Sequence, residues 1–178
     1  MLFKNRNVFL IGLMAVGKTT VGRLLAQELG LAFYDSDRVI EERAGADIAW
    51  IFDVEGEQGF RDREVQVIDE LTAMEGVVVA TGGGVVLREE NRRHLSERGT
   101  VVLLESPVDR LIERTRNDRK RPLLRSANPR ETLERLARER APLYETIADL
   151  RFVADRRSAA TLTRDIAARL RCQETHDA

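Results

Sequence analysis

Short apolar runs alternate with longer amphipathic stretches along the chain. Apolar residues fill most of the positions in five runs, residues 8–11, 31–34, 77–80, 100–104 and 150–153. Lys18 to Leu29 instead places its apolar residues at helical spacing, and so does Ala159 to Leu170 at the end of the chain. Strands that are apolar throughout and alternate with helices indicate a parallel sheet covered on both faces. The pattern therefore predicts an α/β fold of three layers, α/β/α, with a central five-stranded parallel sheet.

The first three apolar runs end in residues that suit a binding site. The first ends at Gly12, the second at Asp35, and the third runs into Thr81-Gly82-Gly83-Gly84. Ligands of open α/β sheets bind at the carboxyl ends of the strands. We expect the functional site at this edge of the sheet.

Two stretches interrupt the alternation. About forty residues, roughly 37–76, separate the second and third strands, which is too many for one crossover helix. We expect several helices there, forming a substrate-binding insertion that includes Trp50 in its packing. A basic stretch at about 115–128 suggests a lid. With no internal repeat or long linker, residues 1–178 are predicted to form one domain.

The segment Gly12-Leu13-Met14-Ala15-Val16-Gly17-Lys18-Thr19 has the spacing of a phosphate-binding loop. It follows a predicted strand and opens a predicted helix, as the motif requires. The two glycines allow the tight turn that points backbone N–H groups at phosphate oxygens, and the helix adds its positive dipole end. Lys18 would reach the outer phosphates and Thr19 would offer a hydroxyl to Mg²⁺. The alternative is a glycine-rich turn in which Lys18 and Thr19 have no role in binding. The predicted strand before the segment and the predicted helix after it argue against that interpretation.

The remaining motifs select among phosphate-loop proteins. A GTPase would show an Asn-Lys-x-Asp type segment, and the chain contains none. A motor or helicase ATPase would carry an acidic residue after the third strand, where this chain has three glycines. Metal support must then come from elsewhere, and Asp35 is the candidate. A small-molecule kinase fits the length, the insertion and the basic lid.

Asp35-Ser36-Asp37 would lie beside the phosphate loop if the second strand neighbours the first. A carboxylate near the γ-phosphate could accept the proton of a substrate hydroxyl. Ser36 or Asp37 could instead cap the following helix. Capping by one of them leaves a catalytic role open for the other.

Two arginines suggest an acceptor that carries a carboxylate. Arg61 lies in a helical pattern with Glu64 one turn on, which could hold it in place, although a surface ion pair fits the spacing equally well. Arg140 is more informative, because it falls on the apolar face of a helix that Asn128 and Pro129 would start. An arginine on such a face must reach out to solvent or pair with an anion.

The basic stretch that follows the fourth strand and its helix contains a run of cations. Such a run is usually a solvated face or a nucleic-acid patch. Its place in a phosphate-loop protein favours a lid over the transferring phosphate. Arg121, fixed by the following Pro122, is our candidate for stabilising transition-state charge.

Net charge and cysteine content bear on the partners and the cellular location of the protein. The formal net charge is −1, which gives no general attraction to nucleic acid or membrane. There is one cysteine, Cys172, and no apolar run of membrane-spanning length. We expect a cytoplasmic protein, a monomer, with a frayed polar tail from Gln173 to Ala178.

Taken together, these motifs resemble those of the shikimate kinase family. The matching segments are residues 12–23, Asp35-Ser36-Asp37, Phe60-Arg61 with Glu64, Gly82-Gly83-Gly84, Arg121-Pro122-Leu123-Leu124 and Arg140-Ala141-Pro142-Leu143-Tyr144. The resemblance covers nearly the whole chain. It implies a nucleoside-monophosphate-kinase-like fold and transfer of the ATP γ-phosphate to the 3-hydroxyl of shikimate, in the pathway to chorismate and aromatic amino acids.

The resemblance also implies roles for individual residues. Asp37 would contact the shikimate hydroxyls as the candidate base, Arg61 and Arg140 would hold the carboxylate, and Gly82-Gly83-Gly84 would contact the ring substituents. Lys18 and Arg121 would act on the phosphates, with Arg121 touching both substrates, while Thr19 would bind Mg²⁺ supported by Asp35. The positions implied to contact ATP are Gly12, Ala15, Val16, Gly17, Lys18, Thr19, Thr20, Arg114, Arg121 and Arg157.

Two rival interpretations follow from the same residues. A kinase of another small acid such as gluconate would also use paired arginines, but Phe60-Arg61 and the three glycines favour shikimate. A non-catalytic module that binds ATP or shikimate would not need Lys18, Thr19, Asp37 and Arg121 together.

Overall fold

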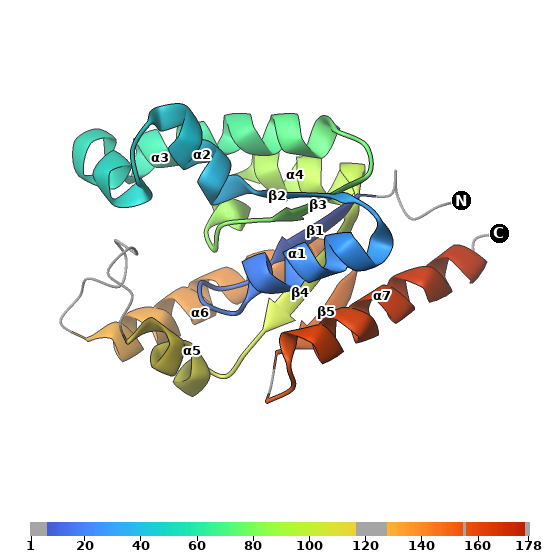
Figure 1. Cartoon of the computed structure of the whole chain (residues 1–178). Coiled ribbons are helices and arrows are strands. Elements are labelled where there is room, and N and C mark those ends of the chain that lie inside the picture. The colour runs from blue at the N-terminus through green and yellow to red at the C-terminus, as the bar shows by residue number, and fades with distance from the viewer. Residues whose placement is uncertain (1–6, 117–127, 155, 177–178) are drawn as a thin grey trace.

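The computed structural model describes residues 7–116, 128–154 and 156–176 (Figure 1). One sheet has the strand order β2-β3-β1-β4-β5, and its neighbouring strands pair in parallel. The strands are β1 (Val8–Ile11), β2 (Ala32–Asp35), β3 (Val77–Ala80), β4 (Thr100–Glu105) and β5 (Leu150–Val153). The predicted parallel five-stranded sheet is confirmed. β2 begins one residue later than expected, and β4 extends one residue further, to Glu105.

Helices connect these strands in chain order. They are α1 (Lys18–Leu29), α2 (Ser36–Ala44), α3 (Ile48–Ala73), the 3-10 turn η2 (Val85–Leu87), α4 (Glu89–Arg98), α5 (Val108–Thr115), α6 (Pro129–Ile147) and α7 (Ala159–His176). α1 has the predicted limits and ends at Gly30, whose φ of 67° is the left-handed conformation that favours glycine. α7 continues to His176, so the expectation of a frayed tail from Gln173 was wrong for residues up to that point.

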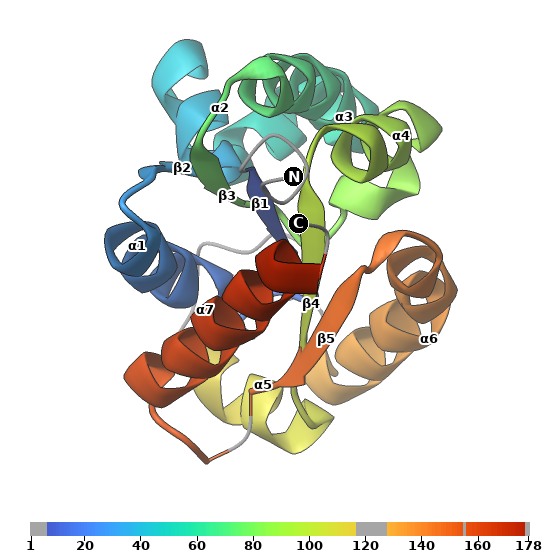
Figure 2. The ribbon, with the colours of Figure 1, turned by 90° about the vertical axis from the view of Figure 1, so that its right-hand side faces the viewer.

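The sheet lies between two layers of helices (Figure 2). Val8 and Leu10 of β1 face a cluster built with α1 and α7, while Phe9 and Ile11 face a second cluster built with α3, α4 and α6. Successive side chains of a strand point to opposite faces, so a central strand must be apolar at every position. All four residues of β1 are fully buried. The apolar runs in the sequence follow directly from this arrangement.

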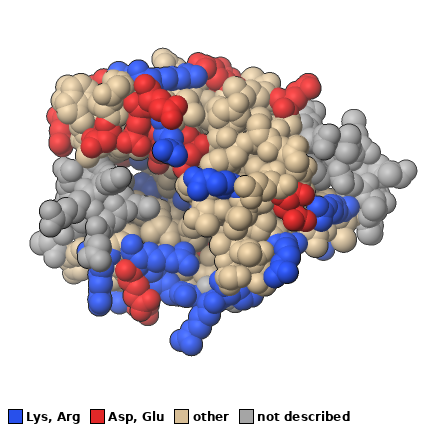
Figure 3. Space-filling view, in the orientation of Figure 1, with Lys and Arg blue, Asp and Glu red and all other residues tan. Residues whose placement is uncertain are grey.

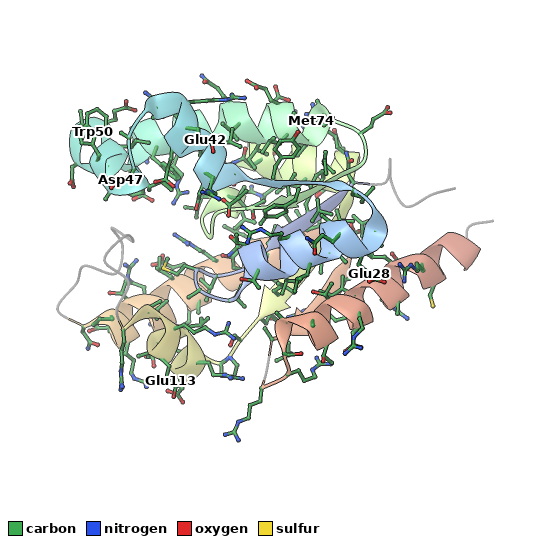
Figure 4. All side chains as sticks on the ribbon, in the orientation of Figure 1. Glu28, Glu42, Asp47, Trp50, Met74 and Glu113 are labelled. Carbon is green, nitrogen blue, oxygen red and sulfur yellow. The ribbon has the colours of Figure 1, made fainter. Side chains whose placement is uncertain are left out.

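The inserted residues form two helices, α2 and α3. α2 and the first part of α3 lie at the carboxyl edge of the sheet, and the rest of α3 runs back over the sheet (Figure 1). α3 is kinked at Gly56, which has φ 75° and ψ 175°. Trp50 lies at the outer end of this lobe with 48% of its surface exposed, so the expectation that it packs inside was wrong (Figure 4). Within the described part of the chain, no helix is both long and apolar enough to cross a membrane.

Candidate active site

A cleft of about 640 Å³ runs along the carboxyl edge of the sheet. This volume is in the range of small-molecule sites. Its lining comes from the loop between β1 and α1, the start of α2, α3, the residues after β3, α6 and the start of α7. In Figure 3, acidic side chains gather over α2 and α3 on one side of the hollow, and basic side chains lie on the other.

Backbone geometry shapes the phosphate loop. Gly12 has φ 144°, and a Cβ atom there would lie 2.3 Å from the carbonyl oxygen of Leu104 on β4. Gly17, with φ 106°, is the N-cap of α1, and no side chain caps the N–H groups of that helix. Ala15 also has a positive φ, 64°. The uncapped N–H groups and the helix dipole therefore face the cleft as an anion site.

Lys18 and Thr19 stand at the start of α1. Lys18 is 7% exposed, and its Nζ donates to the carbonyl oxygens of Gly12 at 2.6 Å and Leu13 at 2.8 Å. The Thr19 hydroxyl donates to Oδ2 of Asp35 at 2.6 Å. Asp35 therefore lies beside the phosphate loop, as predicted. The condition given for this, that the second strand neighbours the first, was wrong, because β3 lies between β1 and β2. The contact arises because all three strands end at the same edge of the sheet.

Asp35 also caps α2. Its Oδ1 accepts the N–H groups of Asp37 and Arg38 at 3.0 and 3.3 Å. The expectation that Ser36 or Asp37 caps this helix was therefore wrong. Capping by Asp35 leaves the Asp37 carboxylate available to the cleft.

The pair formed by Thr19 and Asp35 suits Mg²⁺, which takes hard oxygen ligands and binds through one or two protein groups plus substrate phosphates. Among the described residues, no group of three or more His, Cys, Asp and Glu side chains could hold a metal by itself. A Mg²⁺ ion at this position would accordingly depend on a bound nucleotide.

Asp37 is a carboxylate in an unfavourable setting. Its Oδ1 is buried without a hydrogen-bond partner. Burial, and then the charges of Glu64 and Asp35, raise the pKa of Asp37 to about 7, against the lowering effect of Lys18 and Arg61. A carboxylate with a pKa near neutrality is suited to exchange a proton with a substrate hydroxyl.

Arg61 and Glu64 form a buried ion pair. Arg61 Nη1 donates to Glu64 Oε1 at 2.8 Å, and the two side chains are 5% and 0% exposed. The alternative of a surface ion pair is therefore wrong. Burial raises the pKa of Glu64, with Arg61 acting in the opposite direction. Arg61 Nε has no partner and remains a buried donor beside the cleft.

Arg140 lies on the buried face of α6, as its helical position predicted. It is 2% exposed, and its Nη1 has no hydrogen-bond partner. Burial lowers the pKa of Arg140, and the neighbouring Tyr144 acts in the opposite direction. A guanidinium held dry with a free N–H is complementary to an anionic ligand.

The three glycines after β3 bring the backbone against these side chains. A Cβ on Gly82 would lie 2.7 Å from Oδ1 of Asp37, and one on Gly84 would lie 2.2 Å from Nη2 of Arg61. A Cβ on Gly83 would lie 3.3 Å from Nη1 of Arg140. Glycine is needed here for close approach, and side chains from α2, α3 and α6 converge on one short segment.

The basic residues expected near the nucleotide are placed in part. Arg114 Nη1 donates to the carbonyl oxygens of Ala15 and Val16 at 3.1 and 3.0 Å, and Arg157 donates to Asp165 of α7. Arg114, Arg157 and Thr20 all line the cleft. Residues 117–127, which make up most of the expected lid and include Arg121, lie outside the described residues.

Comparison with known proteins points to one family. The family model described as Shikimate kinase matches residues 14–171. A shikimate kinase of Actinobacillus pleuropneumoniae is 62% identical over 156 residues, 88% of this chain and 90% of the relative. One from Haemophilus influenzae is 56% identical, covering 92% and 91%.

Solved structures agree. The shikimate kinase from Acinetobacter baumannii in complex with shikimate superposes with a TM-score of 0.93 at 44% identity, over 94% of each chain. A gluconokinase from Sinorhizobium meliloti shares the fold, with a TM-score of 0.59 at 18% identity over 96% and 94% of the chains.

Proposed function

This chain belongs to the shikimate kinase family and phosphorylates shikimate with ATP, and we propose that the transfer takes place between the phosphate loop and the Asp37 carboxylate. The phosphoryl acceptor in this proposal is the 3-hydroxyl of shikimate. The cleft supports it by joining an anion site at one end to unpaired arginine donors at the other.

At the donor end, the N–H groups of the loop and Lys18 bind the ATP phosphates. Arg121, from a lid at about 115–128, adds positive charge as the phosphoryl group moves. Thr19 and Asp35 would hold Mg²⁺, and the ion would neutralise phosphate charge when bound. Arg114 and Arg157 border the nucleotide further along the cleft.

At the acceptor end, Arg61 and Arg140 bind the shikimate carboxylate, and the backbone of Gly82-Gly83-Gly84 contacts the ring. The two-pronged guanidinium matches carboxylate geometry. Asp37 orients the 3-hydroxyl and takes its proton as the phosphoryl group is transferred. The solved relative bound to shikimate supports this choice of acceptor.

One observation carries the proposal. Two buried polar atoms, Oδ1 of Asp37 and Nη1 of Arg140, have no partner and flank consecutive glycines, Gly82 and Gly83. Leaving such atoms unpaired is costly, and a ligand that pairs with both atoms would remove that cost. That ligand needs a hydroxyl for Asp37 and an anion for Arg140, and a hydroxy-acid supplies both.

Two substitutions test the assignment. Asp37→Asn should lower kcat by about 10²–10⁴-fold while the Kd for ATP changes little, because the carboxylate acts on the acceptor. Arg61→Ala should raise the KM for shikimate and leave the KM for ATP unchanged. Unchanged turnover in Asp37→Asn, or a shift confined to ATP in Arg61→Ala, would contradict these roles.

We also propose that residues 1–178 act as one domain, with a substrate-binding insertion at about 37–76, and that the protein is a cytoplasmic monomer. The cysteine content supports this setting, because one cysteine, Cys172, allows no internal disulfide. Sedimentation of the purified protein measures its oligomeric state.

A further inference from the structure

Tyr144 lies directly behind the acceptor site, in a motif whose tyrosine was given no role in the sequence analysis. It lies one turn after Arg140 on α6, so both side chains share the buried face of that helix. Its hydroxyl donates a hydrogen bond to the carbonyl oxygen of Gly83. The same hydroxyl lies close enough to the Arg140 guanidinium to interact with it electrostatically. Tyr144 thus connects one substrate-facing arginine to the glycine segment.

Packing holds the Tyr144 ring in one position. The residue is 4% exposed and belongs to the apolar cluster beneath α3, α4 and α6, together with Ile147. α6 packs against η2, which begins directly after Gly84. A tyrosine in such a place contributes a fixed apolar body and one polar group at its tip.

The hydroxyl remains a donor over the working pH range. Burial raises the pKa of Tyr144 to about 12, with Arg140 acting in the opposite direction. The O–H therefore points at the Gly83 carbonyl, and the lone pairs of its oxygen remain available to the neighbouring guanidinium. Arg140 Nη1 has no hydrogen-bond partner, and it lies 3.3 Å from the position that a Cβ of Gly83 would take.

We propose that Tyr144 is a positioning residue for the acceptor: its hydroxyl, fixed on the Gly83 carbonyl, orients the neighbouring Arg140 guanidinium before shikimate arrives. An arginine side chain has many rotamers, and fixing them before binding removes that cost from the binding step. This inference rests on the proposed role of Arg140 in binding the shikimate carboxylate.

Tyr144→Phe tests the proposal because it removes the hydroxyl and keeps the ring. We expect the KM for shikimate to rise about tenfold, the effect of one hydrogen bond to a charged group. The kcat and the KM for ATP should change less than about twofold. The matched control is Tyr34→Phe, since Tyr34 is the other tyrosine of the chain and contributes no atom to the proposed site. Assays run well below the melting temperature of every variant.

A double-mutant cycle separates positioning from a purely structural role. If Tyr144 acts through Arg140, Tyr144→Phe should have little further effect on the KM for shikimate in an Arg140→Ala background. An unchanged KM in Tyr144→Phe, or an equal rise in both backgrounds, overturns the inference. So does a fall in melting temperature without a change in KM. If Arg140→Ala itself leaves the KM unchanged, the proposed acceptor site fails instead.

Discussion

Replacing Asp37 by Asn should stabilise the folded protein at neutral pH while removing its activity. The folded state raises the pKa of this carboxyl from 3.8 to about 7, chiefly through burial and the charge of Glu64. A carboxyl whose pKa is raised by folding binds its proton more tightly in the folded state. Its ionisation therefore weakens folding progressively as pH rises from 3.8 towards 7. An amide at this position cannot ionise and escapes the penalty.

The magnitude follows from linkage. Each pKa unit corresponds to about 1.36 kcal/mol, so the two units between pH 5 and pH 7 amount to about 2.7 kcal/mol. We expect the stability advantage of Asp37→Asn to grow by about 1–3 kcal/mol over this interval. For a chain of this length that is about 3–10 °C in melting temperature. The amide that replaces the Asp37 carboxyl does not titrate, so its own effect on the free energy of unfolding is the same at both pH values and cancels in the comparison.

Thermal melts at pH 5 and pH 7.5, without nucleotide and with EDTA, measure the effect. Asp62→Asn is the control, because that side chain is 67% exposed and pairs with Arg88 at the surface. The difference in melting temperature between Asp62→Asn and the parent protein should be similar at the two pH values. The reasoning is refuted if the melting temperature of Asp37→Asn exceeds that of the parent by the same amount at both pH values, or by less at pH 7.5.

Three further outcomes are expected from the same site. The kcat/KM for shikimate should fall about tenfold per pH unit below pH 7, as Asp37 takes up its proton, and a flat profile down to pH 5.5 would exclude it as the base. Glu64→Gln should destabilise the protein by about 2–4 kcal/mol in denaturant titrations, because it leaves the buried Arg61 guanidinium with only the 3.4 Å contact to the half-exposed Glu57; a loss below about 1 kcal/mol would show that the pair is solvated. Gly84→Ala should raise the KM for shikimate at least about tenfold with the KM for ATP unchanged, because the new Cβ would lie 2.2 Å from Arg61 Nη2. Normal shikimate kinetics in that variant would contradict the close packing.

The sheet and the phosphate loop could be predicted from sequence because their signals are local. β1 is apolar at every position since it is buried on both faces, and Gly12 to Thr19 are neighbours in the chain. The burial of Arg140 followed from helical periodicity alone. In each case the pattern that reveals the feature lies within one short segment of the sequence.

Other features depend on contacts between distant segments. The bond from Tyr144 to Gly83 joins residues 61 apart, and nothing in either segment indicates it. The spacing of Arg61 and Glu64 indicates a pair but not its burial, which comes from the packing of α3 on the glycine segment. The sequence also does not decide which residue caps α2, because Asp35, Ser36 and Asp37 are adjacent and each has a side chain that can cap a helix. The prediction gave Asp35 only a metal-supporting role, whereas the structure shows that it is the N-cap.

The most direct test measures ADP release by the purified protein with ATP and Mg²⁺ in the presence of shikimate, of gluconate, and of no acceptor. We predict release that depends on shikimate, with a phosphorylated product whose ³¹P coupling identifies the 3-position. Release that is equal with gluconate, or that ignores shikimate, would contradict the function described for this cleft.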